Sequence, residues 1–151
     1  MIGVAALRTR RASAQPRVVK IGALTESWGP TPAIVGLRDG LGELGYREDA
    51  DYTIGVRFTG GKTADLPEAA RELVRHKIDL IVTTETGAAA RAAQEATRQI
   101  PIVFIGAGDP VGSGLVRSFA RPGANITGIA DLDIELAPKR MQIFRDRKSV
   151  V

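Results

Sequence analysis

The residues best suited to hold a ligand lie in three short segments, and each segment directly follows an apolar run. The segments cover residues 25–32 (TESWGPTP), 83–87 (TTETG) and 106–113 (GAGDPVGS). They combine hydroxyl groups, carboxylates, one indole and several glycines, which are suited to binding a small polar solute. The candidate ligand-binding residues are Ser27, Trp28, Thr84, Glu85, Thr86, Gly87, Gly108 and Asp109.

The segment 83–87 has the composition of a helix start. Threonine is a good N-cap, and the unpaired N–H groups of a first helical turn favour an anion together with the helix dipole. A ligand carboxylate or phosphate fits such a position. The alternative is that Thr84 or Thr86 only caps its own helix, and the sequence leaves both interpretations open.

Asp109 and Trp28 each admit two interpretations as well. Asp109 lies in a turn before Pro110, and a short helix is expected to start within residues 112–116. Its carboxylate either receives a ligand ammonium group or caps that helix. Trp28, the only tryptophan, either stacks on a ligand or packs beneath its own loop.

The helix start at 83–87 and the Asp109 carboxylate are expected to face one crevice. This pair of groups favours a small zwitterion or carboxylate as the ligand.

Catalytic and metal-binding chemistry finds no support in the residue pattern. The chain has no cysteine, and its one histidine, His76, is expected at a helix end, where a cation complements the helix dipole. No Ser-His-Asp set and no metal-ligand spacing is present. We therefore expect a binding protein that is not an enzyme and has no cofactor and no metal. The alternative is a flavodoxin-like redox or enzyme domain, because residues 25–31 loosely resemble a phosphate-binding loop.

The order of the elements explains how these segments come together. Five apolar runs alternate with helical periodicities, which predicts an α/β fold with an open parallel sheet flanked by helices. Right-handed crossovers favour the strand order 2-1-3-4-5, and ligands bind beyond the carboxyl ends of the strands in such a sheet. The expected strands cover residues 18–24, 51–58, 78–83, 102–105 and 126–130, and the expected helices 34–44, 65–74, 86–98 and 135–144.

Local signals refine the boundaries of these elements. Gly45 is placed to end the first helix in a left-handed conformation. Asp65 and Glu68 have the spacing of a capping box at the start of the second helix. Residues 51–58 alternate in polarity, which is typical of a half-exposed edge strand.

The formal charge of +4 is concentrated at the two ends of the chain. Without the basic residues of 8–20 and 145–148, thirteen basic residues face sixteen acidic ones, so the globular part has no basic face for a nucleic acid. Residues 1–17 form either a degenerate export signal, with small residues at 12–14, or a disordered basic tail. No apolar run approaches the ~20 residues of a membrane span.

Several segments resemble ABC transporter substrate-binding proteins, of the group that includes tryptophan- and tyrosine-binding lipoprotein-like members. Residues 37–46 (LRDGLGELGY) are similar to the FRQGLKEAGY of that family, and residues 66–74 (LPEAARELV) to its LPALAAELV. The match runs from residue 18 to about residue 144 in the family's order. Residues 101–104 (PIVF) resemble part of the family's IPIVF, and residues 108–111 (GDPV) resemble its GDPV. Residues 121–128 (RPGANITG) resemble RPGGNVTG, and Lys139-Arg140 stands where the family's KRLELL begins.

This resemblance implies one lobe of a type I periplasmic-binding-protein-like fold, in which two α/β lobes clamp a ligand. Residues 18–133 would be the N-terminal ligand-binding lobe, and residues 134–151 the start of an inter-lobe helix and a frayed C-terminus. The implied function is the solute-binding component of an ABC importer, here a fragment, which binds an amino-acid-like or carboxylate solute in the inter-lobe cleft. The implied partner of the full-length form is a membrane permease, and the implied location is periplasmic or extracytoplasmic. For a lone lobe we also expect a homo-oligomer.

Overall fold

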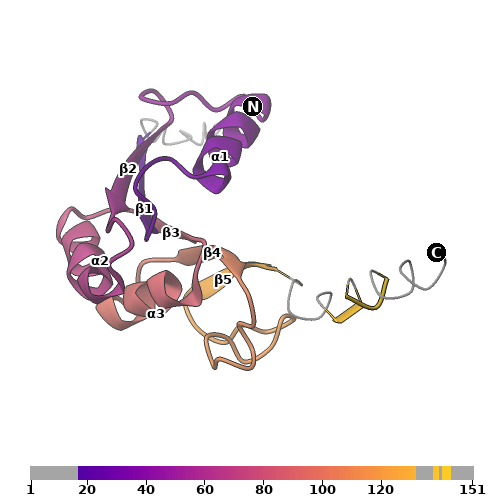
Figure 1. The fold of residues 1–151 in the computed structure, drawn as a ribbon. Coiled ribbons are helices and arrows are strands. Elements are labelled where there is room, and N and C mark those ends of the chain that lie inside the picture. Colours follow the sequence, from indigo (N-terminus) through magenta and orange to yellow (C-terminus); the bar gives the residue numbers. More distant parts are fainter. Residues whose placement is uncertain (1–16, 132–137, 140, 144–151) are drawn as a thin grey trace, which may run out of the picture.

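Five parallel strands form one sheet in the order β2-β1-β3-β4-β5 (Figure 1). The computed structural model describes residues 17–131, 138–139 and 141–143. The predicted fold class and strand order are confirmed. The strands are β1 (Val19–Thr25), β2 (Tyr52–Phe58), β3 (Leu80–Thr84), β4 (Ile102–Ala107) and β5 (Ile126–Ala130); the helices are α1 (Pro32–Glu43), α2 (Leu66–Arg75) and α3 (Gly87–Ala96), with a short 3-10 turn η1 (Thr63–Asp65).

The strand β1 lies between β2 and β3, and it pairs in parallel with both. The chain therefore runs from β1 outward to β2, returns across the sheet to β3, and continues to β4 and β5. Connections that leave in opposite directions open a crevice at the carboxyl ends of the two central strands. In the register Leu24 pairs with Thr83, so the two segments that follow these residues begin side by side.

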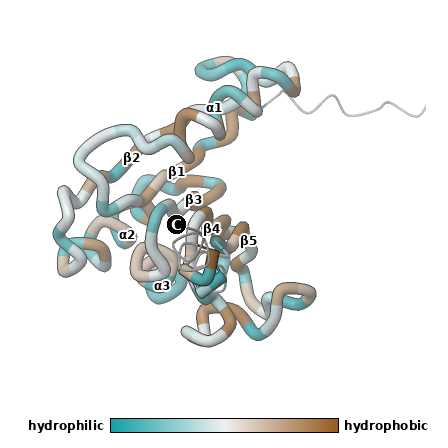
Figure 2. The backbone as a smooth tube through the Cα atoms, turned by 45° about the vertical axis from the view of Figure 1, so that its right-hand side comes forward, coloured by the Kyte–Doolittle hydropathy of each residue, from teal (hydrophilic) through white to brown (hydrophobic). Residues whose placement is uncertain are grey.

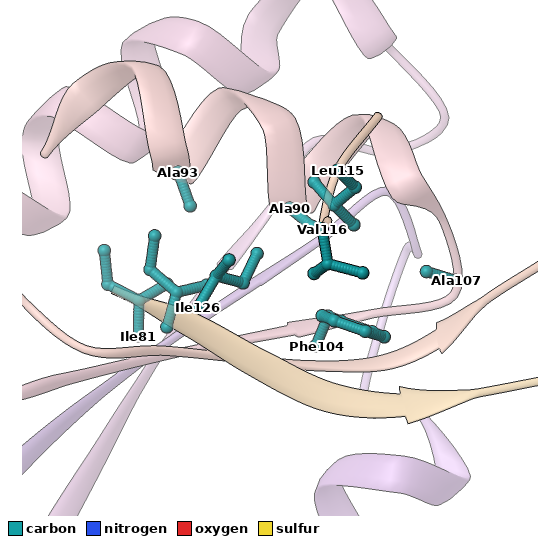
Figure 3. Packing of buried hydrophobic residues seen from close by; sticks show 9 residues of the cluster. Ile81, Ala90, Ala93, Phe104, Ala107, Leu115, Val116 and Ile126 are labelled. Atoms are coloured by element: carbon teal, nitrogen blue, oxygen red, sulfur yellow. The ribbon is translucent and has the colours of Figure 1, made fainter. Parts of the chain in front are cut away.

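The α2 and α3 helices cover one face of the sheet (Figure 1). The alanines of α3 face the side chains of β3, β4 and β5, and their short side chains let the helix pack close to the sheet (Figure 3). Burial of this apolar surface is the main driving force for the packing. The buried cluster on this face consists of Ile81, Ala90, Ala93, Ile102, Phe104, Ala107, Leu115, Val116 and Ile126.

The opposite face carries a smaller cluster beside α1. Its buried members are Ile21, Tyr52 and Val82, and α1 adds the partly buried Leu37 and Leu41. Figure 2 shows hydrophobic residues along the strands of the sheet. Ile129 of β5 pairs with Ile105 of this face and is exposed, so the cover by α1 does not extend to β5.

Gly45 ends α1 as the sequence predicts. Its φ is +88°, its N–H donates to the Gly42 carbonyl, and the Tyr46 N–H donates to the Leu41 carbonyl. These two bonds define a Schellman motif, which satisfies carbonyl groups of the last helical turn.

The predicted capping box of α2 is wrong. Asp65 makes no side-chain cap hydrogen bond, because its backbone (φ −85°, ψ −13°) is already helical after η1. A capping side chain needs an extended N-cap residue. Glu68 instead pairs with Arg71 at 3.0 Å and Arg75 at 2.8 Å.

The predicted short helix within residues 112–116 is also absent from the described structure. This segment forms consecutive turns, with Gly114 at φ +71°. Asp109 accepts a hydrogen bond from the Gly112 N–H at 2.7 Å and so closes a turn.

Most of the predicted helix 135–144 lies outside the described residues; the residues 138–139 and 141–143 are helical. Among the described residues, no helix has the length and apolar character that a membrane span requires.

A glycine exchange tests the close approach of β5 to β4. A Cβ at Gly128 would lie 2.1 Å from the Phe104 carbonyl oxygen, so Gly128→Ala should lower the free energy of unfolding by about 1–3 kcal/mol. Gly55→Ala is the matched control in β2, where nothing lies within 4 Å, and its effect should stay within about 0.5 kcal/mol. Urea denaturation compares the two variants, and equal effects would contradict the described β4–β5 pairing.

The exposed apolar residues near β5 predict self-association of the chain. Ile129 is 67% exposed in β5, which has no strand on its outer side in the described structure, and Phe119 is 64% exposed nearby in sequence. Open strand edges with apolar side chains favour pairing between copies. Light scattering should detect a dimer or larger species, and Ile129→Lys should shift it toward the monomer. Val35→Lys on α1, where Val35 is 47% exposed, should leave the distribution unchanged; a monomer at all concentrations would refute the prediction.

Candidate functional site

The three segments proposed from the sequence meet at the carboxyl edge of the sheet. The Thr25 hydroxyl donates to the Glu85 carboxylate at 2.7 Å, which joins the ends of β1 and β3. The Glu85 N–H donates to the Ile105 carbonyl at 3.1 Å, which joins the ends of β3 and β4. Since the strands are parallel and adjacent, their ends form one continuous edge.

Glu26 links the loops at this edge. Its carboxylate accepts one hydrogen bond from the Thr63 hydroxyl and one from the Thr86 hydroxyl, each at 2.5 Å. Glu26 follows β1, Thr63 follows β2 and Thr86 follows β3, so one side chain joins three loops. Glu26 is not among the site residues predicted from the sequence. The available signal was its position as the only acidic residue within 25–32.

Thr86 is the N-cap of α3. Its backbone is extended (φ −134°, ψ 152°), and its side chain accepts a hydrogen bond from the Ala89 N–H. The capping interpretation is therefore confirmed. The Glu26 carboxylate lies at the same helix start, where the dipole stabilises a negative charge. Binding of a ligand anion at Thr86 and Gly87 stays a prediction, and a ligand anion would have to share this position with Glu26.

Glu85 and Thr84 have unusual environments at the end of β3. Glu85 is exposed and has φ +74°, a conformation that glycine adopts more readily than residues with a Cβ atom. Thr84 is fully buried, and its hydroxyl has no hydrogen-bond partner among the described residues. A buried hydroxyl without a partner costs about 1–3 kcal/mol, so such groups are uncommon in stable folds.

Trp28 is 84% exposed, so it does not pack beneath its own loop. One side of the indole lies over Gly60, since a Cβ there would be 3.0 Å from the ring. The positive φ of Gly60, +58°, and the missing side chain both favour glycine at this position. Stacking of a ligand on Trp28 stays a prediction.

A hollow of about 630 Å³ lies beside Trp28, between β2 and α2. Charged pairs line it on the α2 side. Hydrogen bonds from Arg75 and Arg71 lower the pKa of Glu68, and a hydrogen bond from Arg57 lowers the pKa of Glu72. These carboxylates are paired within the chain and lie on the flank of the sheet.

Two further carboxylates lie beyond β4 and β5. Asp109 is exposed, and its side chain is used in the turn to Gly112; reception of a ligand ammonium group by Asp109 stays a prediction. Asp131 follows β5 and is not among the site residues predicted from the sequence. A Cβ at Gly106 would lie 3.1 Å from the Asp131 carboxylate and 3.6 Å from the Glu85 backbone nitrogen. Asp131 and Glu85 therefore lie against the same glycine.

The hydroxyl groups of the loop 25–31 form hydrogen bonds with other groups of the chain. The Thr25 hydroxyl binds Glu85 and accepts from the Ser27 N–H, and the Ser27 hydroxyl accepts from the Gly29 N–H. Thr31 caps α1. A flavodoxin-like phosphate loop would need these groups for the phosphate. No group of three or more His, Cys, Asp or Glu side chains with metal-binding geometry occurs within the described residues.

The parallel sheet and the three loops at its carboxyl edge define an α/β binding lobe. Comparison with known families shows which class of protein this lobe belongs to. A model of the family described as ABC transporter substrate binding protein matches residues 19–148. The chain belongs to this family. The family consists of binding proteins, in agreement with the expectation that the chain is not an enzyme.

Individual relatives support the assignment. The chain is 31% identical over 119 residues to a tyrosine-binding protein of Clostridioides difficile, covering 79% of the chain and 34% of that protein. A Streptococcus pneumonia ABC domain solved in complex with L-Trp matches with a TM-score of 0.68 and 30% identity, over 76% of the chain and 39% of that structure. A conserved domain protein of Vibrio cholerae matches with a TM-score of 0.70 and 33% identity, over 77% of the chain and 40% of that structure. The chain thus spans about a third of the curated relative and about two fifths of these structures.

Removal of Glu26 tests the link between the loops. Glu26→Ala should lower the free energy of unfolding by about 1–3 kcal/mol, because two hydroxyl groups lose a charged acceptor. Glu43→Ala, at the exposed end of α1, is the control and should change it by less than about 0.5 kcal/mol. Amide hydrogen exchange should show faster exchange at 60–63 and 86–89 only in Glu26→Ala. Unchanged exchange at both segments would contradict the proposed link.

Proposed function

We propose that the chain supplies the N-terminal ligand-binding lobe, residues 18–133, of the substrate-binding component of an ABC importer. The observation that carries the proposal is the meeting of the β1, β3 and β4 segments at one carboxyl edge in a member of this family. Residues 1–17 are proposed as an export signal or basic tail, and residues 134–151 as the start of an inter-lobe helix. The proposed partner is a membrane permease, and the proposed location is extracytoplasmic.

The proposed ligand is an amino acid with an aromatic side chain. Support comes from the printed names of two relatives, one tyrosine-binding and one in complex with L-Trp. The exposed Trp28 ring offers a surface for an aromatic side chain, and offset stacking of two rings stabilises such contacts by about 0.5–1.5 kcal/mol. The proposed contact residues are Ser27, Trp28, Thr84, Glu85, Thr86, Gly87, Gly108 and Asp109.

A second lobe is needed for tight binding. Small-molecule sites commonly bury 70–90% of the ligand surface, and an open sheet edge covers one side of a ligand. Two hollows of the described structure lie beside Trp28, between β2 and α2, and between α3 and the loop 111–124. Neither is lined by the residues that end β3 and β4, which agrees with a site that is closed by residues from another lobe.

Binding by this chain should therefore be weak and measurable. Titration of the isotope-labelled chain with L-Trp or L-Tyr, followed by NMR, should give a Kd near 1 mM, or about 4 kcal/mol. Amide signals of 26–29 and 85–87 should shift. Trp28→Ala should weaken binding several-fold and Trp28→Phe should weaken it less, because a ring remains. The absence of shifts with L-Trp at about 10 mM, roughly ten times that Kd, and with L-Tyr at its solubility limit would refute the proposal.

A further inference from the structure

We propose that an apolar hollow beside the end of α1 is a docking site for residues 2–7 of the same chain. The hollow has a volume of about 480 Å³ and lies at the amino edge of the sheet, opposite the edge proposed for the ligand. The segment 2–7 (IGVAAL) lies outside the described residues. Docking takes residues 1–17 as a retained tail, and it does not depend on the proposed function.

The walls of the hollow come from three strands and from the end of α1. Val19, Tyr52 and Leu80 are the first residues of β1, β2 and β3, which places the hollow at the amino edge. Leu41 and Tyr46 line it from the last turn of α1 and from the residue after Gly45. Val19 is 43% and Tyr46 53% exposed, so apolar surface is open to solvent here. The lining residues are Arg17, Val19, Ile21, Leu41, Tyr46, Asp51, Tyr52 and Leu80.

The α1 helix packs more loosely than α2 and α3, which lie on the other face of the sheet (Figure 1). Of the twelve described residues of α1 only Ile34 is buried, whereas α2 buries three residues and α3 four. Leu37 and Leu41 are only partly buried against the sheet. An amphipathic helix on a protein surface normally covers the core with an apolar stripe along its length. The end of α1 therefore has room for further apolar side chains beside it.

The described part of the chain begins at this hollow. Arg17 is the first described residue and one of the lining residues, and its guanidinium group pairs with the Asp79 carboxylate. The Lys20 N–H donates to the same carboxylate at 2.9 Å, so the start of β1 is held beside the hollow. Nine residues separate Leu7 from Arg17, and an extended chain of that length spans up to about 30 Å. The segment 2–7 is therefore attached close enough to reach the hollow.

The chemistry of the hollow favours an apolar occupant. Its two charged lining residues are already paired, Arg17 with Asp79 and Asp51 with Arg47. The segment 2–7 carries no charged and no hydroxyl side chain, and removal of its apolar side chains from water is favourable. Because the segment is covalently attached to Arg17, the contact is intramolecular, and a small contact area is sufficient to hold it.

A charge placed in the segment tests the docking in the full chain. The N–H groups of residues 44–46 are bonded to carbonyl groups of the last turn of α1, so their exchange with solvent reports on the stability of this helix end. Val4→Asp should speed amide hydrogen exchange at 44–46 at least about fivefold, because the segment no longer supports the helix end. Ala14→Asp is the matched control, since it makes the same change of charge outside the apolar run, and it should change exchange by less than about twofold. Equal exchange in the two variants would overturn the proposal.

Disulfide formation identifies the occupant, because the chain has no cysteine of its own. Gly3→Cys combined with Arg47→Cys should form an intramolecular disulfide at least about tenfold faster than Gly3→Cys combined with Arg71→Cys. Arg47 follows Tyr46 and pairs with Asp51 of the hollow, whereas Arg71 is an exposed, ion-paired arginine on α2, at the opposite face. Equal rates for the two pairs would overturn the proposal. A covalent dimer through position 47 would also overturn it, because the occupant would then be a second copy of the chain.

Discussion

The parallel pairing of β1 with both β2 and β3 is the constraint on which the rest of this structure depends. Because β1 is central, the chain must leave it on one side and return on the other, which brings the carboxyl ends of β1 and β3 together. Parallel strands place all five such ends on one edge. The location of the proposed ligand contacts follows from this arrangement.

Hydrogen bonds between carboxylates and hydroxyl groups then determine the shape of the edge. Glu26 holds the loops after β2 and β3, and Glu85 is held by Thr25. Each of these interactions joins residues far apart in the sequence. Charge-assisted hydrogen bonds are shorter and stronger than neutral ones, so a few of them are sufficient to order short loops. The loops in turn fix where charge is presented to a ligand.

The positions of the strands and helices could be predicted because they depend on local periodicity and turn chemistry, and the strand order because right-handed crossovers leave few arrangements. Gly45 is an example, since a left-handed residue after an amphipathic helix has few alternatives to glycine. The predictions that failed, and the site residues that were not predicted, involve interactions that local sequence patterns do not encode. The spacing of Asp65 and Glu68 fits a capping box, but η1 makes the Asp65 backbone helical. Glu26 and Asp131 were not selected because their contacts appear only when the strands are side by side.

The link made by Glu26 has a consequence for the kinetics of ligand exchange. A loop that is already ordered loses little conformational entropy when a ligand arrives, so less of the contact energy is consumed in ordering. Encounter with such a preorganised surface requires no slow rearrangement of this lobe. Differences in affinity between related ligands would then arise mainly from their dissociation rates.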